Sequence, residues 1–287
     1  MDISAVVLTK NSHETLEVVL RRLKGLVKEI VVVDGGSRDN TVEIAKKYAD
    51  KILFDEGKGL GYARELGRKN CSCEYIMTID SDALVNPKFV DIASKLMDSD
   101  DSIGAVSCKV VPLIKKNSLN PIEKFQCWNI SANIHLNLPE YPQPVEALPC
   151  TITLYRAKAL EVAGGFDYRM RLAREDSAIS HRLREAGYKL FYAPKVRSIH
   201  LERATHFKVN RKYGKAWKCY RKYYPTYANL RRIYATLAHI IPCIPFPYWI
   251  YRYTKLYLHT PLRKNILCLS LMETWRHIER LIGLMGL

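Results

Sequence analysis

The first 80 residues alternate between strand-like and helix-like patterns, and this alternation limits the possible folds more than any other feature of the chain. Short apolar runs with β-branched members predict strands, and apolar residues at three- and four-residue steps predict amphipathic helices. The predicted strands are 3–8, 29–33, 52–54 and 75–79, and the predicted helices are 16–26, 39–48 and 60–69. This order predicts an α/β fold with a mostly parallel sheet flanked by helices.

Polar side chains stand where three of these strands end. Thr9 follows the first strand, Asp34 follows the second, and Asp80 and Asp82 follow the fourth. In an open α/β sheet, the loops at the carboxyl ends of the strands converge on the ligand crevice. We therefore expect these four side chains to face one site.

The Asp80-Ser81-Asp82 sequence displays two carboxylates at the edge of the predicted sheet. Carboxylate oxygens are ligands for hard cations such as Mg²⁺ or Mn²⁺, which bind substrate phosphate at the same time. Such an ion would neutralise the charge that develops on a departing diphosphate. The pair taken alone is more typical of a solvated turn that caps the helix beginning at Pro87, so the metal-site interpretation depends on the rest of the chain.

The strand and helix patterns continue to about residue 205, where the character of the chain changes. Further strands are predicted at 103–111, 147–155, 190–193 and 196–200, and further helices at 87–97 and 175–186. We therefore predict two domains: an amino-terminal α/β domain over 1–205, and a basic, aromatic helical region over 206–287.

Six short motifs follow one another along the first domain. They are VVLTKN at 6–11, VVVDGGSRDNT at 31–41, GLGYAR at 59–64, IDSDA at 79–83, GGFD at 164–167 and RED at 174–176. In type and order this set resembles the family 2 glycosyltransferases, whose catalytic domain has the Rossmann-like GT-A fold. The resemblance covers about residues 1–205 and implies an enzyme that takes a sugar from a nucleotide-sugar donor and inverts its anomeric centre.

The resemblance also implies roles for the residues at the strand ends. Thr9 and Asp34 would hold the nucleoside, and Arg64 would contact the base or the pyrophosphate. Asp80 and Asp82 would bind the ribose and the Mn²⁺ or Mg²⁺ ion that bridges the sugar diphosphate. Gly35 and Glu65 depart from the residues of many relatives, so the choice between a UDP and a GDP donor stays open.

Three later residues complete the site that the resemblance implies. Asp176 would be the base, because an acceptor hydroxyl must lose its proton as it attacks the sugar, and Glu175 would support it by contacting the acceptor. On their own, both acids are also typical of the first turn of a helix, where negative charge is favourable. His200, at the end of the last predicted strand, resembles a third metal ligand, although a lone His is more often structural.

The acidic pair at 175–176 also bears on the acceptor. A phosphate acceptor is already ionised and needs no base, whereas a sugar hydroxyl does. We therefore expect transfer to a sugar already carried by a polyprenyl or dolichyl lipid, with polyprenyl phosphate itself as the alternative. A catalytically silent domain that acts as a membrane scaffold is a hypothesis of another class, against which the intact Asp80, Asp82 and Asp176 argue.

The carboxy-terminal region is strongly basic. Its last 87 residues contain 16 Lys or Arg and only 3 Asp or Glu. They therefore hold most of the formal charge of +16 that the whole chain carries. Residues 203–224 mix these cations with Tyr, Trp and Phe, so we expect a helix whose aromatic side chains reach a membrane interface. Residues 233–251 carry no Asp, Glu, Lys or Arg, and this run is almost long enough to span a bilayer. Three prolines interrupt it, so we expect a re-entrant helix or a broken helix in the membrane plane instead of a straight span. Residues 266–287 predict an amphipathic helix.

These features predict a partner for the basic region. Cations interleaved with Tyr are also a footprint of RNA binding, but a long uncharged run and an amphipathic helix favour anionic lipid over nucleic acid. The eight cysteines are scattered without a C-x-x-C pair, which is typical of reduced thiols in the cytoplasm. We therefore expect a protein at the cytoplasmic face of the cell membrane.

Overall fold

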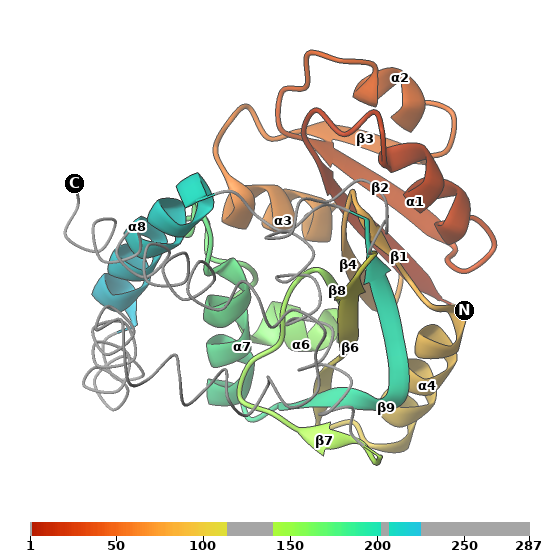
Figure 1. Cartoon of the computed structure of the whole chain (residues 1–287). Coiled ribbons are helices and arrows are strands. Elements are labelled where there is room, and N and C mark those ends of the chain that lie inside the picture. Colours follow the sequence, from red (N-terminus) through yellow and green to blue (C-terminus); the bar gives the residue numbers. More distant parts are fainter. Residues whose placement is uncertain (1, 114–139, 202–206, 225–287) are drawn as a thin grey trace, which may run out of the picture. The chain divides into compact units, whose positions relative to one another are not determined.

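The computed structural model describes residues 2–113, 140–201 and 207–224, and these divide between two compact units (Figure 1). The first unit contains a β-sheet and the helices beside it. The second contains Leu172–Arg174 and helix α8 (Phe207–Tyr223). The domain boundary after residue 205 stays a prediction, and the predicted segments at 233–251 and 266–287 lie outside the described residues.

The sheet of the first unit has nine strands in the order β3-β2-β1-β4-β8-β6-β9-β5, with β7 beside β9. The strands are β1 (Ile3–Thr9), β2 (Glu29–Asp34), β3 (Lys51–Phe54), β4 (Tyr75–Asp80), β5 (Ala83–Leu84), β6 (Ile103–Pro112), β7 (Gln143–Pro144), β8 (Ile152–Arg156) and β9 (Lys189–His200). All four strands predicted within the first 80 residues are therefore confirmed.

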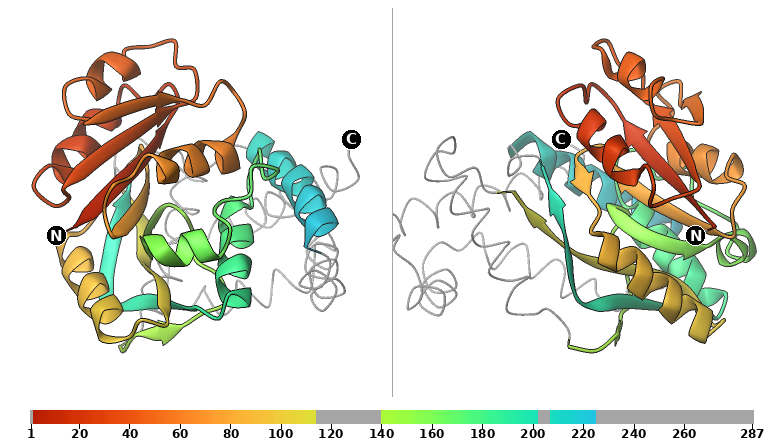
Figure 2. Two further views of the ribbon diagram at one scale, coloured as in Figure 1. Left: turned by 180° about the vertical axis from the view of Figure 1, so that it is seen from behind. Right: turned by 90° about the vertical axis from the view of Figure 1, so that its right-hand side faces the viewer.

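Helices cover both faces of this sheet (Figure 2). Successive side chains of β1 point to opposite faces, so Ala5 and Val7 belong to one buried cluster and Val6 and Leu8 to the other. The first cluster lies under α1 (Leu16–Leu23), α2 (Thr41–Ala45) and α4 (Pro87–Ser99), and the second under α3 (Leu60–Lys69), α6 (Ala157–Val162) and α7 (Glu175–Glu185). The result is a three-layer α/β/α unit.

The expectation of a mostly parallel sheet is wrong, because the sheet is mixed. The first four strands pair in parallel, as their helical crossovers require. Strand β8, however, runs antiparallel to both β4 and β6, and β5 and β7 run antiparallel to β9. The direction of a strand depends on its connection to the rest of the sheet, and β8 is buried throughout like the parallel strands, so its apolar pattern does not reveal its direction.

The two last predicted strands form one bent strand, β9, which Figures 1 and 2 show turning sharply. Lys195 has a φ of 50°, and the register of β9 against β6 shifts between Ser107 and Lys109. This irregularity separates the two apolar runs that suggested two strands. Beyond it, β9 continues to His200, which lies at the same edge of the sheet as the end of β4.

Helix α8 has a cationic and an aromatic composition, with seven Lys or Arg and no Asp or Glu. Tyr220 is stacked on Trp217 and on Tyr224, with ring centroids 5.6 and 4.9 Å apart. Tyr220 and Tyr224 are buried, so the expectation that the aromatic side chains reach a membrane is wrong for these two. Among the described helices, none combines the length and apolar character that crossing a bilayer requires.

The amino ends of the strands, opposite the predicted site, are joined by the buried carboxylate of Glu29 on β2. Its oxygens accept hydrogen bonds from Ser4 on β1, from Lys51 on β3 and from the backbone and side chain of Ser72. Burial opposes ionisation, but these hydrogen bonds outweigh it and lower the pKa of Glu29 to about 2. One charged side chain thus fixes three strands and the loop before β4.

We predict that Glu29→Gln lowers the free energy of unfolding by about 1–3 kcal/mol at pH 7, because a charged acceptor of several hydrogen bonds is lost. The folded-state pKa of Glu29 lies below the ordinary value of 4.5, so its contribution is present above pH 4.5 and disappears as the pH falls towards 2. Urea unfolding at several pH values measures both effects. Glu43→Gln, which removes the exposed partner of Lys46, should change stability by less than about 0.5 kcal/mol.

Candidate active site

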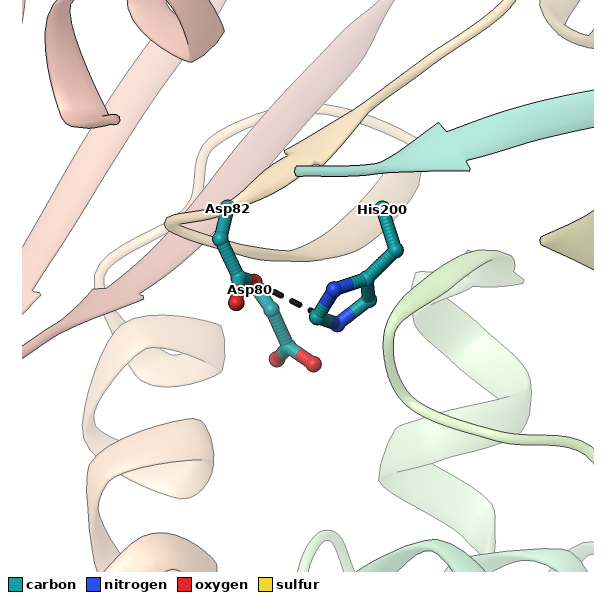
Figure 3. Close-up of side chains that lie close together, drawn as sticks. All are labelled: Asp80, Asp82 and His200. Atoms are coloured by element: carbon teal, nitrogen blue, oxygen red, sulfur yellow. Dashed lines mark ion pairs between the residues drawn. The ribbon is translucent and has the colours of Figure 1, made fainter. Parts of the chain in front are cut away.

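Two carboxylates and an imidazole meet where β4 and β9 end (Figure 3). One oxygen each of Asp80 and Asp82 and one nitrogen of His200 all lie within 4.8 Å of one another, and His200 Nε2 is 3.5 Å from Asp82 Oδ1. All three side chains are partly exposed. Two carboxylates suit Mg²⁺ or Mn²⁺, and an imidazole can serve as a third ligand. The structure therefore brings together the three residues that the sequence suggested as metal ligands.

Strand pairing explains why His200 lies beside the aspartates. The short strand β5 follows Asp82 directly and pairs with the end of β9, so that Ala83 lies opposite His200. The backbone N–H of Leu201 donates to the carbonyl of Asp82 at 2.7 Å. The loop is also fixed from the other side, since the hydroxyls of Ser81 and Ser12 are 2.8 Å apart. Strand β5 was not predictable from the sequence, because a two-residue strand has no periodicity to recognise.

Arg64 lies beside the aspartates, with a guanidinium that is almost completely buried. Its side chain is 3% exposed, Nη2 is 2.9 Å from Asp80 Oδ1 and Nε is 3.3 Å from Glu175 Oε1. Arg64 comes from α3 and Glu175 from the first turn of α7, on the same face of the sheet. The guanidinium therefore connects the proposed metal site to the acidic pair at 175–176.

Glu175 and Asp176 are neighbours in different surroundings. Glu175 is buried against Arg64, and burial raises the pKa of its carboxyl, an effect that the positive charge of Arg64 opposes. Asp176 is partly exposed, and its Oδ1 accepts hydrogen bonds from the N–H and hydroxyl of Ser177. Of the two acids, Asp176 is the one whose surroundings keep it accessible to a substrate.

Thr9 and Asp34 lie side by side at the ends of β1 and β2, where their backbones are paired. The carboxylate of Asp34 is engaged by its own loop, because Oδ2 accepts the N–H groups of Gly36 and Ser37 at 2.9 and 2.8 Å. Thr9 Oγ1 and Arg64 Nη1 are buried and have no hydrogen-bond partner within the described part of the chain. A buried polar group without a partner costs about 1–3 kcal/mol, and a ligand that bonded to these atoms would recover that cost.

Glu65, which departs from the family pattern, has a clear structural role. Its Oε2 accepts the backbone N–H of Phe166 at 2.9 Å, and its carboxylate pairs with Arg68 at 2.7 Å. A Cβ atom at Gly165 would lie 2.3 Å from the same oxygen, and the φ of 70° at this residue favours glycine. Glu65 therefore holds the loop that follows α6. Its difference from the family pattern does not show whether the donor nucleotide is UDP or GDP.

Asp167 in the same loop is buried and ion-paired with two arginines. Its Oδ2 is 2.6 Å from Arg169 Nη2 and 3.2 Å from Arg182 Nη2. This loop also covers the start of α3, since the carbonyls of Met170 and Arg171 accept the N–H groups of Gly61 and Leu60. The loop thus sets the position of the helix that carries Arg64.

Comparison with known proteins identifies the family. The model of "Glycosyl transferase family 2" matches residues 4–164. The poly-beta-1,6-N-acetyl-D-glucosamine synthase of Staphylococcus aureus (strain COL) is 28% identical over 192 residues, which cover 64% of this chain and 46% of the synthase. The corresponding synthase of Staphylococcus epidermidis is 27% identical over 201 residues, covering 67% and 48%. The chain thus spans about half the length of the curated relatives it matches.

Solved structures share the fold at low sequence identity. The mannosyltransferase PcManGT from Pyrobaculum calidifontis, in complex with GDP-Man and Mn²⁺, has a TM-score of 0.60 at 16% identity and covers 98% of this chain and 87% of its own. GalNAc-T7 with UDP, GalNAc and Mn²⁺ has a TM-score of 0.55 at 17% identity, covering 76% of this chain and 51% of its own. The chain belongs to glycosyl transferase family 2 and has a GT-A-like fold.

Proposed function

We propose that this glycosyltransferase moves a sugar from a UDP- or GDP-linked donor to a lipid-linked sugar acceptor, with inversion and with the help of Mn²⁺ or Mg²⁺. The main support for this proposal is that the side chains of Asp80, Asp82 and His200 lie close together at one edge of the sheet. These three side chains would hold the cation, which supplies positive charge beside the diphosphate leaving group. PcManGT with GDP-Man and GalNAc-T7 with UDP both contain Mn²⁺, which supports this choice of donor and metal.

The transfer replaces one bond at the anomeric carbon by another. The bond from this carbon to the diphosphate oxygen breaks as the bond to the acceptor oxygen forms on the opposite side. In this proposal Asp176 accepts the proton that the acceptor hydroxyl loses. Its partly exposed carboxylate suits that role, because a substrate can approach it and no Lys or Arg side chain among the described residues forms an ion pair with it.

An acceptor on a lipid is supported by the surface of α8. The side chains of Lys212, Lys215, Lys218 and Lys222 are exposed and recur at three- and four-residue steps, which places them on one face of the helix. We call these four residues the lysine stripe. Because Tyr220 and Tyr224 are buried, the proposed membrane contact depends on charge and not on inserted aromatic rings. The uncharged apolar run at 233–251 favours a lipid surface over RNA as the partner of this basic region. We propose that the protein binds the cytoplasmic face of the membrane.

Removal of the metal tests the proposed reaction. We predict that chelation with EDTA abolishes sugar transfer from UDP- or GDP-sugars to a lipid-linked glycan, and that excess Mn²⁺ restores it. Asp82→Asn should lower kcat/KM by about 100-fold or more, because charge on the leaving diphosphate is no longer offset. Asp91→Asn, an exposed change on α4, is the matched control and should leave turnover unaltered. Full activity in EDTA would contradict the proposal.

The proposed base separates two classes of acceptor. We predict that Asp176→Asn lowers kcat by about 10²–10⁴-fold with a sugar acceptor, while the affinity for the nucleotide stays the same. Glu185→Gln, an exposed change at the end of the same helix, should be neutral. Near-normal turnover of Asp176→Asn with polyprenyl phosphate would instead indicate an acceptor that is already ionised.

The lysine stripe predicts salt-sensitive binding to anionic lipid. We expect the full chain to float more strongly with phosphatidylglycerol vesicles than with phosphatidylcholine vesicles, and each lysine near the surface contributes about 1 kcal/mol. Replacing all four lysines of the stripe by Gln should reduce this difference at least about tenfold. The same charge loss at Lys46, Lys47, Lys88 and Lys95, which are exposed on the first unit, should have little effect. Tighter binding to RNA than to either vesicle would contradict a membrane role.

A further inference from the structure

The guanidinium of Arg64 is held between two carboxylates that belong to different parts of the site. Nη2 lies 2.9 Å from Asp80, a proposed metal ligand, and Nε lies 3.3 Å from Glu175, the neighbour of the proposed base. The exposed fractions are 3% for Arg64 and 8% for Glu175, against 32% for Asp80. The positive charge is thus buried, and only one of its two partners is open to solvent.

Helix α3, which carries Arg64, is held at its first turn. The start of α3 is bonded to the loop after α6 through the N–H groups of Leu60 and Gly61. A Cβ atom at Gly61 would lie 2.0 Å from the carbonyl oxygen of Asp167, so the helix packs directly on that loop. The guanidinium therefore has a defined position, and Asp80 can adopt an orientation set by it.

The charges of this cluster bear directly on metal binding. A guanidinium beside Asp80 orients its carboxylate but also competes with a cation for it. Glu175 offsets the charge of Arg64 from the buried side, so that Asp80 does not have to do so alone. Metal-ligating carboxylates are commonly held by such outer hydrogen-bond partners, and loss of one partner costs about 10–100-fold in metal affinity.

We propose that Arg64 and Glu175 are positioning residues for the metal site: Arg64 orients Asp80, and Glu175 balances the charge of Arg64 so that Asp80 remains able to bind the cation. This rests on the proposed metal dependence and departs from the roles that the family resemblance implied for both residues. Glu175 then acts through Arg64 and not through the acceptor. Arg64 Nη1, which has no partner in the described structure, is left for a ligand.

The test measures metal binding apart from catalysis. The full chain is titrated with Mn²⁺ in the presence of UDP and, separately, GDP, and the EPR signal of free Mn²⁺ gives the dissociation constant. We predict that Arg64→Lys and Glu175→Gln each raise this constant about tenfold, and that the double variant shows no further loss, because both changes break one connection. Glu175→Gln should leave the KM for the acceptor unchanged.

Asp176→Asn is the matched control, because it neutralises the next carboxylate of the same helix turn, whose oxygen is bonded to Ser177. It should alter the dissociation constant of Mn²⁺ by less than twofold. Thermal melting shows which variants fold, and if Arg64→Lys does not, Glu175→Gln decides the question by itself.

Two results of the Mn²⁺ titration separate the role of Glu175 from metal dependence itself. If the unaltered chain binds Mn²⁺ and Glu175→Gln binds it equally well with a raised acceptor KM, Glu175 is an acceptor contact and the inference is wrong. If the unaltered chain binds no Mn²⁺ with either nucleotide, the proposal of a metal-dependent reaction is wrong, and the roles proposed for Arg64 and Glu175 are wrong as well.

Discussion

The antiparallel pairing of β5 with the end of β9 is the interaction on which the site depends. It places Ala83 opposite His200, and the bond from the N–H of Leu201 to the carbonyl of Asp82 closes the arrangement. The aspartates come from the first half of the chain and the imidazole from its last described strand. Without this pairing the two carboxylates would form an ordinary acidic turn, which is one of the interpretations that the sequence alone leaves open.

A second constraint is the different burial of two adjacent acids. Glu175 is enclosed with Arg64, and burial raises the pKa of its carboxyl, whereas Asp176 stays partly exposed. One helix turn can therefore supply a charge that organises the interior and a carboxylate that is open to substrate. The same separation of roles holds for the sheet, whose amino ends are fixed by Glu29 while its carboxyl ends carry the site.

The parts of the fold that were predictable are those encoded in local patterns. The strands before residue 80 and helix α3 follow from apolar periodicity, and strand ends identified Thr9, Asp34 and Asp80. The antiparallel direction of β8 was not predictable, because it depends on a connection and not on the residues of the strand. The hydrogen bonds of Arg64 could not be predicted either, because they join this residue of α3 to residues 16 and 111 positions away in the sequence. The bond of Glu65 to the loop after α6 could not be predicted for the same reason.

The proposed reaction requires Asp80, Asp82 and His200 to hold one divalent cation together. The most direct measurement is anomalous diffraction from a crystal soaked with Mn²⁺ and either UDP or GDP. We expect one strong anomalous peak within about 2.0–2.6 Å of an oxygen of each aspartate and a nitrogen of His200, with a phosphate oxygen beside it. A peak elsewhere, or density for the nucleotide without a peak between these side chains, would contradict it.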